Sequence, residues 1–175
     1  QFVFTPAGYG VGGVGQLQPF PGMTNGVGQM RPDSKGFVRA RTADPDDAPA
    51  IQPNYLSAAA DQRAIVEGLR WCRRFLATAA LLPYRGPETL PGADVATDDE
   101  LLDYARQQGA TVYHAVSTCR MGHDPLAVVG VDLKVHGIAG LRVVDASIMP
   151  TMPSANTNAA TLMIAEKAAD LIAGN

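Results

Sequence analysis

The spacing of apolar residues predicts a long amphipathic helix from about residue 58 to residue 82. Apolar side chains recur there every three or four residues, the period of a helix that buries one face: Ile65, Leu69, Cys72 and Leu76. Polar residues between them can occupy the other faces: Asp61, Arg63, Glu67 and Arg74. We therefore expect this helix to pack with its apolar face against a core.

Start and stop signals predict two further helices. Thr97 and Glu100 have the spacing of a capping box, and the helix that they open is expected to end at Gly109. A last helix is expected to begin at residues 156–158, with one asparagine side chain as its N-cap, and to end at Gly174. Its expected inner stripe is Leu162, Ala165, Ala169 and Ile172.

Short apolar runs between turn residues predict strands. The sequence places them near residues 2–4, on both sides of the polar turn 44–47, at 111–116, and at 132–136 and 141–145, with a glycine connection between the last two. The first 30 residues hold 8 of the 18 glycines, which favours short strands and irregular loop there.

One glycine pattern in that region matches a nucleotide-binding fingerprint, G-x-G-x-x-G, at residues 10–15. The fingerprint needs a helix to begin at this point, so that free backbone amides face a pyrophosphate. Pro19, Pro21 and further glycines fall within the would-be helix. We therefore interpret residues 10–15 as a flexible glycine loop.

Composition limits the classes of protein that remain. The 175 residues are 46% apolar and 18% charged, too apolar for disorder, and no apolar run approaches the roughly 20 residues that span a bilayer. A net charge of -3 gives no basic footprint for nucleic acid. The chain starts at Gln1, which we interpret as an internal cut with a missing upstream part. The sequence names no compartment, and we expect a soluble protein of a bacterial-type cytoplasm.

Few residues offer chemistry by themselves. Cys72 and Cys119 match no zinc spacing and are interpreted as free thiols, with a disulfide between them as the alternative. His114 is expected at the end of a strand, half-buried, where either a core role or a catalytic role is open. His123 and His136 are interpreted as structural. No metal constellation and no G-x-S-x-G nucleophile elbow are present in the sequence.

Three blocks follow one another from residue 113 onward. They read Tyr-His-Ala-Val-Ser-Thr-Cys-Arg-Met-Gly at 113–122, Gly-Leu-Arg-Val-Val-Asp-Ala-Ser-Ile-Met-Pro at 140–150, and Asn-Thr-Asn-Ala-Ala-Thr-Leu-Met-Ile-Ala-Glu-Lys at 156–167. In this order they closely resemble the C-terminal signature of the glucose–methanol–choline (GMC) oxidoreductases, flavoenzymes that oxidise alcohols. Residues 31–36 and 53–56 also resemble segments of that family's substrate domain. The resemblance is closest to the choline-dehydrogenase-like branch and to oxidases of aryl and hydroxymethyl alcohols.

The resemblance implies site roles. His114 matches the active-site histidine that accepts the substrate hydroxyl proton while hydride leaves for flavin N5, a role suited to imidazole because its pKa lies near working pH. Asn156 matches the partner that hydrogen-bonds the substrate oxygen, with Asn158 as the alternative. The resemblance also implies FAD as cofactor, contacted at Tyr113, Asp145, Ala146, Thr157 and Asn158. The family commonly has Pro-Val-Gly-Thr after its histidine, where this chain has Ala-Val-Ser-Thr at 115–118.

The resemblance further implies an α+β fold that is the C-terminal portion of a GMC fold. Residues 1–112 would be mostly substrate-binding domain with an antiparallel sheet and flanking helices. Residues 113–175 would carry the catalytic segment and the closing strand and helix of the FAD-binding domain. The family's N-terminal Rossmann part is absent from these residues, so we expect it as a partner, supplied as a second chain, and a small alcohol as substrate. A FAD-containing hydroxynitrile lyase and a non-catalytic remnant module are the alternatives.

Overall fold

The computed structural model describes residues 1–9 and 16–174, and the glycine pattern at residues 10–15 lies outside the described residues. The chain divides into two compact units. The first unit comprises residues 1–35 and 54–110, and the second comprises residues 36–53 and 111–175. No helix among the described residues has the length and apolarity needed to cross a membrane.

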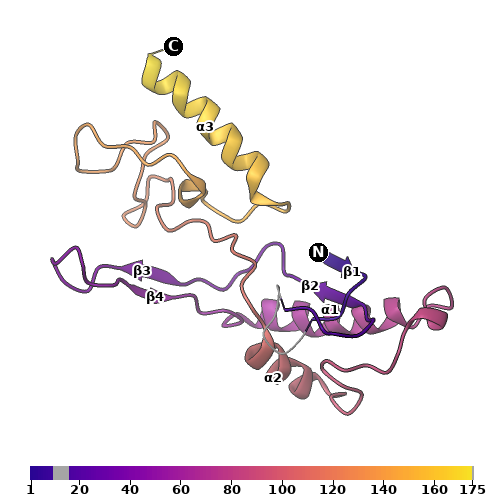
Figure 1. Ribbon diagram of the computed structural model, residues 1–175. Coiled ribbons are helices and arrows are strands. Elements are labelled where there is room, and N and C mark those ends of the chain that lie inside the picture. The colour runs from indigo at the N-terminus through magenta and orange to yellow at the C-terminus, as the bar shows by residue number, and fades with distance from the viewer. Residues whose placement is uncertain (10–15, 175) are drawn as a thin grey trace. The chain divides into compact units, whose positions relative to one another are not determined.

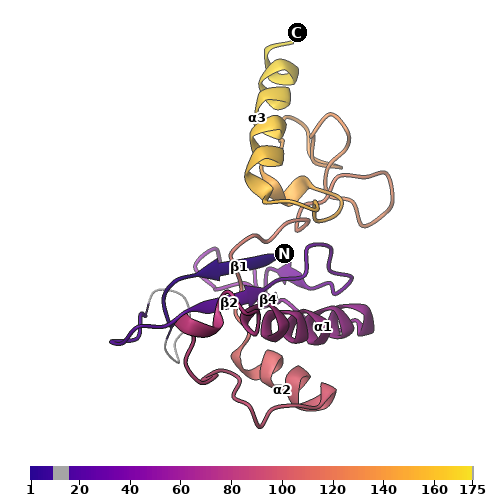
Figure 2. The same ribbon diagram turned by 90° about the vertical axis from the view of Figure 1, so that its right-hand side faces the viewer.

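The first unit places one helix between a small sheet and a second helix. Strands β1 (Phe2–Thr5) and β2 (Thr24–Val27) pair antiparallel, and helices α1 (Ala59–Leu76) and α2 (Asp98–Gln108) follow, with a short 3-10 helix, η1 (Leu82–Tyr84), between them. Figures 1 and 2 show α1 lying between the β1–β2 sheet and α2. The strands predicted in the glycine-rich start are thus present as one two-stranded sheet.

Helix α1 is shorter than predicted, because it ends at Leu76 rather than near residue 82. Residues 77–81 form turns instead, and Pro83 lies further on, within η1. The predicted inner stripe is correct in direction, since Cys72 is buried and its three partners in the stripe are half-buried. Gly68 lies where α1 meets β2, and a Cβ there would approach a Val27 methyl group to 2.6 Å.

Asp61 does not lie on an outer face as predicted. Its side chain is in the interior, 2% exposed, and its carboxylate accepts hydrogen bonds from the backbone amides of Asp33 and Ser34, at 3.0 and 2.7 Å. The Ser34 hydroxyl donates to the same carboxylate and accepts from the amide of Ala58, the residue that precedes α1. The segment at residues 31–36 is therefore tied to the start of α1.

Helix α2 confirms the capping box. Thr97 Oγ1 accepts from the Glu100 amide, and Glu100 Oε2 accepts from the Thr97 amide at 2.8 Å. Gly109 follows the last helical residue, as predicted. Leu101 is fully buried, and an ion pair between Arg70 and Asp98 joins α1 to α2.

The second unit contains a hairpin of β3 (Phe37–Arg39) and β4 (Ala50–Gln52), which pair antiparallel around the predicted polar turn. Side chains within the turn close it, since Asp44 Oδ1 accepts from the Asp46 amide at 3.0 Å and the Thr42 hydroxyl donates to Asp47. Gly36 precedes β3 at a very close approach, because a Cβ there would lie 2.0 Å from the carbonyl oxygen of Gln52.

The strands predicted beyond residue 110 are not formed as regular strands. Residues 111–116 are irregular, and the reason is visible in the backbone: Tyr113 and the nearby Ser117 have φ of 62° and 71°, which no strand contains. The predicted pair at 132–136 and 141–145 is reduced to isolated bridges, with Val135 N donating to Leu141 O and Val143 N to Leu133 O. Gly137 and Gly140 make the turn between them with φ of 78° and 76°, a conformation that favours glycine.

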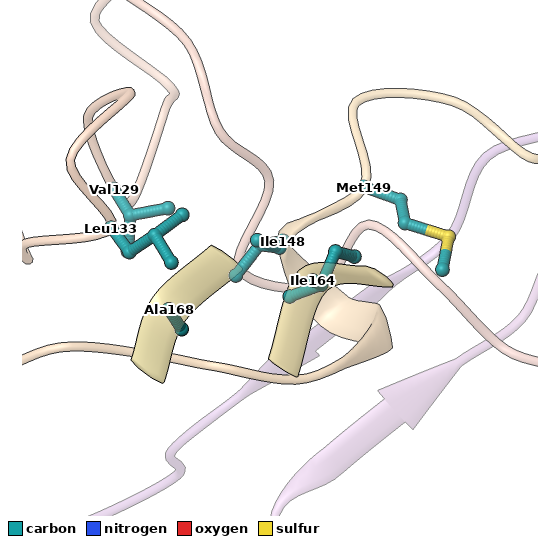
Figure 3. Close-up of a cluster of buried hydrophobic side chains, with 6 residues drawn as sticks. All are labelled: Val129, Leu133, Ile148, Met149, Ile164 and Ala168. Atoms are coloured by element: carbon teal, nitrogen blue, oxygen red, sulfur yellow. The ribbon is translucent and has the colours of Figure 1, made fainter. Parts of the chain in front are cut away.

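Two helices complete the second unit: the 3-10 helix η2 (Ala146–Ile148) and α3 (Thr157–Ala173). Gly174 ends α3 in the left-handed conformation, as predicted. Asn156 occupies the N-cap position, but its side chain makes no capping hydrogen bond, which differs from the prediction. In Figure 3, loop residues, η2 and α3 all contribute to one hydrophobic core: Val129, Leu133, Ile148, Met149, Ile164 and Ala168.

The predicted inner stripe of α3 is wrong. Ile164 and Ala168 face the core, whereas the whole predicted stripe is exposed, with Leu162 at 60% and Ile172 at 62% exposed. The helix carries apolar residues around most of its circumference, so periodicity alone does not distinguish its two apolar faces. Within its unit, α3 therefore keeps one apolar face uncovered.

Both cysteines are free thiols, in agreement with the preferred interpretation. Cys72 is buried in the first unit, and burial raises the pKa of its thiol. Cys119 is only half-buried.

Candidate active site

His114 lies on the irregular segment that enters the second unit, and its side chain is exposed rather than half-buried at a strand end. The residue before it, Tyr113, has φ of 62°, and Ser117 after it has φ of 71°. Residues other than glycine adopt this left-handed region at a cost of about 1–3 kcal/mol each, and such strain concentrates at functional sites. The backbone on both sides of His114 thus has an unusual conformation.

Ser117 is the position at which this chain has serine and the family pattern has glycine, and its backbone conformation explains why glycine is common there. The pattern has glycine where this chain has Ser117, and the φ of 71° is the conformation that glycine adopts without steric penalty. The serine therefore keeps the glycine-like turn and bears its strain.

The imidazole of His114 is in contact with the first turn of α3. Its Nδ1 lies 3.1 Å from Oγ1 of Thr157, the first residue of the helix, whose side chain is buried at 8% exposure. The Thr157 carbonyl in turn accepts a hydrogen bond from the Thr161 hydroxyl at 2.9 Å. Residues 43 positions apart in the chain are thereby joined at one helix end.

The N-terminal end of α3 is open. A helix leaves its first backbone amides without intrahelical partners and carries a partial positive charge there. Asn156 makes no capping bond to these amides, so its own amide group is not committed to the helix. Asn156 and Asn158 are both exposed at this end. The arrangement can receive an anionic or carbonyl-bearing group close to the imidazole.

A second segment lies beside the one that carries His114. Cys119 N donates to Ser147 O at 3.0 Å and Met121 N donates to Ile148 O at 2.8 Å, which ties the signature block after His114 to η2. Asp145 caps η2, accepting from the Ser147 amide at 2.7 Å. The same segment includes Ala146, which is half-buried.

Tyr113 is 85% exposed. Its backbone amide donates to the Thr111 hydroxyl at 3.0 Å. The structure therefore brings His114 and Thr157 into direct contact and places Asp145 and Ala146 on a segment bonded to the same block. It shows no hydrogen bond for the Tyr113 side chain among the described residues.

The sequence analysis did not predict an ion pair between Arg120, in the same block, and Asp124, just after it. The Arg120 guanidinium contacts both carboxylate oxygens of Asp124, at 2.7 and 2.5 Å, and this hydrogen bonding lowers the pKa of the Asp124 carboxyl to about 2. The sequence could have predicted this pair, because residues of opposite charge lie four positions apart on either side of a turn. The pair closes the turn that carries His123.

The other two histidines have different surroundings. His136 Nε2 lies 3.2 Å from the carbonyl oxygen of Gly122, a contact that links two loops of the second unit. His123 is exposed. In the part of the chain that the structure describes, no group of three or more histidine, cysteine or acidic residues is arranged to hold a metal ion.

Comparison with known proteins identifies the family. The sequence model of the family described as GMC oxidoreductase matches residues 32–165. The chain belongs to the GMC oxidoreductase family. Its members are flavoprotein oxidoreductases, and this chain has the fold of the family's C-terminal domain, with small sheets and three α-helices in the residues that the structure describes.

Relatives in this family are similar over nearly the whole chain. The oxygen-dependent choline dehydrogenase of Burkholderia lata is 43% identical over 174 residues, which are 99% of this chain and 31% of that protein. Among solved structures, pyridoxine 4-oxidase from Mesorbium loti matches with a TM-score of 0.77 and 34% identity, over 83% of this chain and 28% of that one. A FAD-dependent oxidoreductase from Chaetomium thermophilum matches with a TM-score of 0.74 and 30% identity, over 82% and 25% of the two chains. The chain thus spans less than a third of the length of these relatives.

Proposed function

We propose that this chain carries the catalytic segment of a FAD-dependent enzyme that oxidises an alcohol to an aldehyde or ketone, with His114 as the base. One observation supports this most: in a chain of the GMC oxidoreductase family, His114 presents an exposed imidazole at the open end of α3, held through Thr157. The base takes the hydroxyl proton of the substrate, and Asn156 donates a hydrogen bond to the substrate oxygen. FAD held by this site would supply the acceptor for the hydride of the carbinol carbon, so that one proton and one hydride would leave the alcohol together.

The chemistry suits the two side chains. Neutral imidazole has an acceptor nitrogen, and a positioned base typically accelerates proton transfer by about 10²–10⁴-fold. The amide of Asn156 can donate to the developing alkoxide without competing for the proton, since an amide is not a base at working pH. Asn156 is free for this role because it does not cap α3.

The open end of α3 fits the flavin. Reduced flavin carries negative charge, and the free amides and positive dipole of a helix N-terminus stabilise such charge. We assign Thr157 and Asn158 to this contact, with the neighbouring segments supplying Tyr113, Asp145 and Ala146. These assignments support a site in which the helix end favours reduction of the cofactor.

The enzyme requires more residues than these. We assign residues 1–112 mainly to the substrate-binding domain and residues 113–175 to the catalytic segment and the closing strand and helix of the FAD-binding domain. The N-terminal part, about two thirds of the relatives' length, would hold the ADP half of FAD. The uncovered apolar face of α3 supports this assignment, since a helix that is apolar on two sides is usually covered on both. The N-terminal FAD-binding part is the occupant that we propose for that face.

Anaerobic mixing with alcohols tests the proposal. The FAD-loaded enzyme, comprising this chain and the N-terminal part, is mixed with choline, pyridoxine or an aryl alcohol, and flavin absorbance is followed. We expect at least one alcohol to bleach the flavin and to yield its aldehyde in equal amount. The 175-residue chain alone, carried through the same FAD loading, is expected to give no bleaching.

Two results would contradict the proposal. An enzyme that keeps its flavin oxidised with all alcohols, yet cleaves a cyanohydrin, would be a lyase. A chain that alone binds FAD and turns over alcohol at the full rate would refute the division into two parts.

A further inference from the structure

We infer that the Thr157 hydroxyl is a positioning group that holds His114 in the one neutral tautomer able to act as a base at Nε2. The inference rests on the proposed function and adds a residue to it. Thr157 was assigned above to the cofactor through its place in the chain, whereas the contact of its side chain is with the imidazole.

The geometry is specific. Oγ1 of Thr157 lies 3.1 Å from Nδ1 of His114, within hydrogen-bonding distance. The histidine is exposed on an irregular segment, so little else restrains its ring, while Thr157 is buried at 8% exposure in the first turn of a 17-residue helix. A fixed hydroxyl therefore contacts a ring that is otherwise free to turn.

The direction of this hydrogen bond decides what the other ring nitrogen can do. A hydroxyl can donate or accept, and neutral imidazole carries its proton on one nitrogen only. If Nδ1–H donates to Oγ1, Nε2 has a lone pair and can take a proton from the substrate. If the hydroxyl donates to Nδ1, Nε2 carries the hydrogen and cannot act as a base. The proposed chemistry requires the first arrangement.

The hydrogen bond from Nδ1–H to Thr157 Oγ1 can also persist during proton transfer. When Nε2 takes the proton, the imidazolium has a hydrogen on each nitrogen, and Nδ1–H still donates to Oγ1. The contact needs no rearrangement during proton transfer, and the ring keeps its orientation. The hydrogen bond made by one nitrogen commonly sets the role of the other in this way.

Three threonine variants of the FAD-loaded enzyme test the inference. Thr157→Val replaces the hydroxyl by a methyl group of similar size, Thr157→Ser keeps the hydroxyl, and Thr161→Val makes the same change one helical turn later, where the hydroxyl contacts only the Thr157 carbonyl. FAD content and the rate of flavin reduction by a saturating alcohol are measured for each. The His114 tautomer is read from ¹⁵N shifts of histidine-labelled enzyme, with His114→Ala identifying the signal.

We expect Thr157→Val to bind FAD normally, to slow flavin reduction about 10–100-fold, the range known for loss of the hydrogen-bond partner of a metal-bound imidazole, and to give a mixture of tautomers. Thr157→Ser is expected to restore most of the rate and the Nδ1–H tautomer. Thr161→Val is expected to match the unmodified enzyme.

Several results would overturn the inference. They are an Nε2–H tautomer in the unmodified enzyme, a Thr157→Val enzyme with unchanged rate and tautomer, or equal losses in all three variants, which would indicate disturbed packing. If His114→Ala itself reduces flavin at the normal rate, the proposed function fails first. If His114→Ala is inactive and Thr157→Val is normal, only the inference fails.

Discussion

At the scale of single residues, Asp61 shows how a charge is accommodated in an interior. Burial alone would raise the pKa of its carboxyl, but hydrogen bonds from Ser34, Asp33 and Gln29 together outweigh burial and leave the pKa below its ordinary value. A carboxylate with a lowered folded pKa stabilises the fold above its unfolded pKa, near 3.9, and this stability is lost as pH falls through the folded pKa.

Asp61→Asn tests this account. The carboxylate accepts four hydrogen bonds, two on each oxygen, and the asparagine NH2 group would face two of those donors with donors of its own. We therefore expect the free energy of unfolding at neutral pH to fall by about 1–3 kcal/mol, the usual cost of an unsatisfied buried polar group. The gap to the unmodified protein should narrow below about pH 4, because the unfolded chain takes up a proton at residue 61 there while the native carboxylate resists protonation until lower pH. Urea unfolding at several pH values measures both effects.

Asp103→Asn is the control, since Asp103 sits in an exposed ion pair with Arg106. It should leave stability near that of the unmodified protein. An Asp61→Asn protein as stable as this control, or a gap that widens towards acid, would contradict the account.

Residues that cap helices were predictable from the sequence. Thr97, Glu100 and Gly174 act within a few residues of themselves, and the structure confirms each. Asp61 was predicted on an exposed face because its hydrogen-bond partners lie about 30 positions earlier in the chain. Helical periodicity carries no information about such distant partners. The contact between His114 and Thr157 was missed for the same reason.

At the scale of elements, close packing between α1 and β2 depends on Gly68. Alanine in a helix interior is normally more stable than glycine by about 1 kcal/mol. Here the added Cβ would lie 2.6 Å from one Val27 methyl group and 3.2 Å from the other, and a β-branched side chain in a packed sheet has little freedom to move away. At position 68, the steric clash with Val27 therefore opposes the higher helix propensity of alanine.

We expect Gly68→Ala to lower the free energy of unfolding by about 1–3 kcal/mol, the range for overpacked sites. In a Val27→Ala background the opposing methyl groups are gone, so the same change should be neutral or stabilising. Urea unfolding of the two single variants and the double variant measures the coupling. Equal stabilisation by Gly68→Ala in both backgrounds would show that the helix and strand are not in close contact.

For helix α3, the sequence predicted the position of the helix but not which of its faces is buried. Its ends were predicted correctly, but the wrong one of two apolar faces was assigned to the core. Which face meets the core depends on Val129, Leu133 and Ile148, which reach it from loops and a 3-10 helix that carry no periodic signal. The strand predicted at 111–116 failed because a left-handed residue at position 113 cannot be inferred from an apolar run.

At the scale of the whole molecule, we propose that His114 is the base of an alcohol-oxidising flavoenzyme. The family, the open helix end and the contact with Thr157 support it together. The sequence blocks alone led to the family, because motifs at fixed order over many residues are specific. The exposed position of the imidazole and its partner came only from the structure.

The most direct measurement is the rate of anaerobic flavin reduction by a saturating alcohol in the FAD-loaded enzyme, compared between the unmodified protein, His114→Ala and His123→Ala. His123 is exposed in the same unit and is the matched control. The account predicts that His114→Ala binds FAD but reduces it slower by about two or more orders of magnitude, while His123→Ala is unchanged. A His114→Ala enzyme that reduces its flavin at the normal rate would contradict the account.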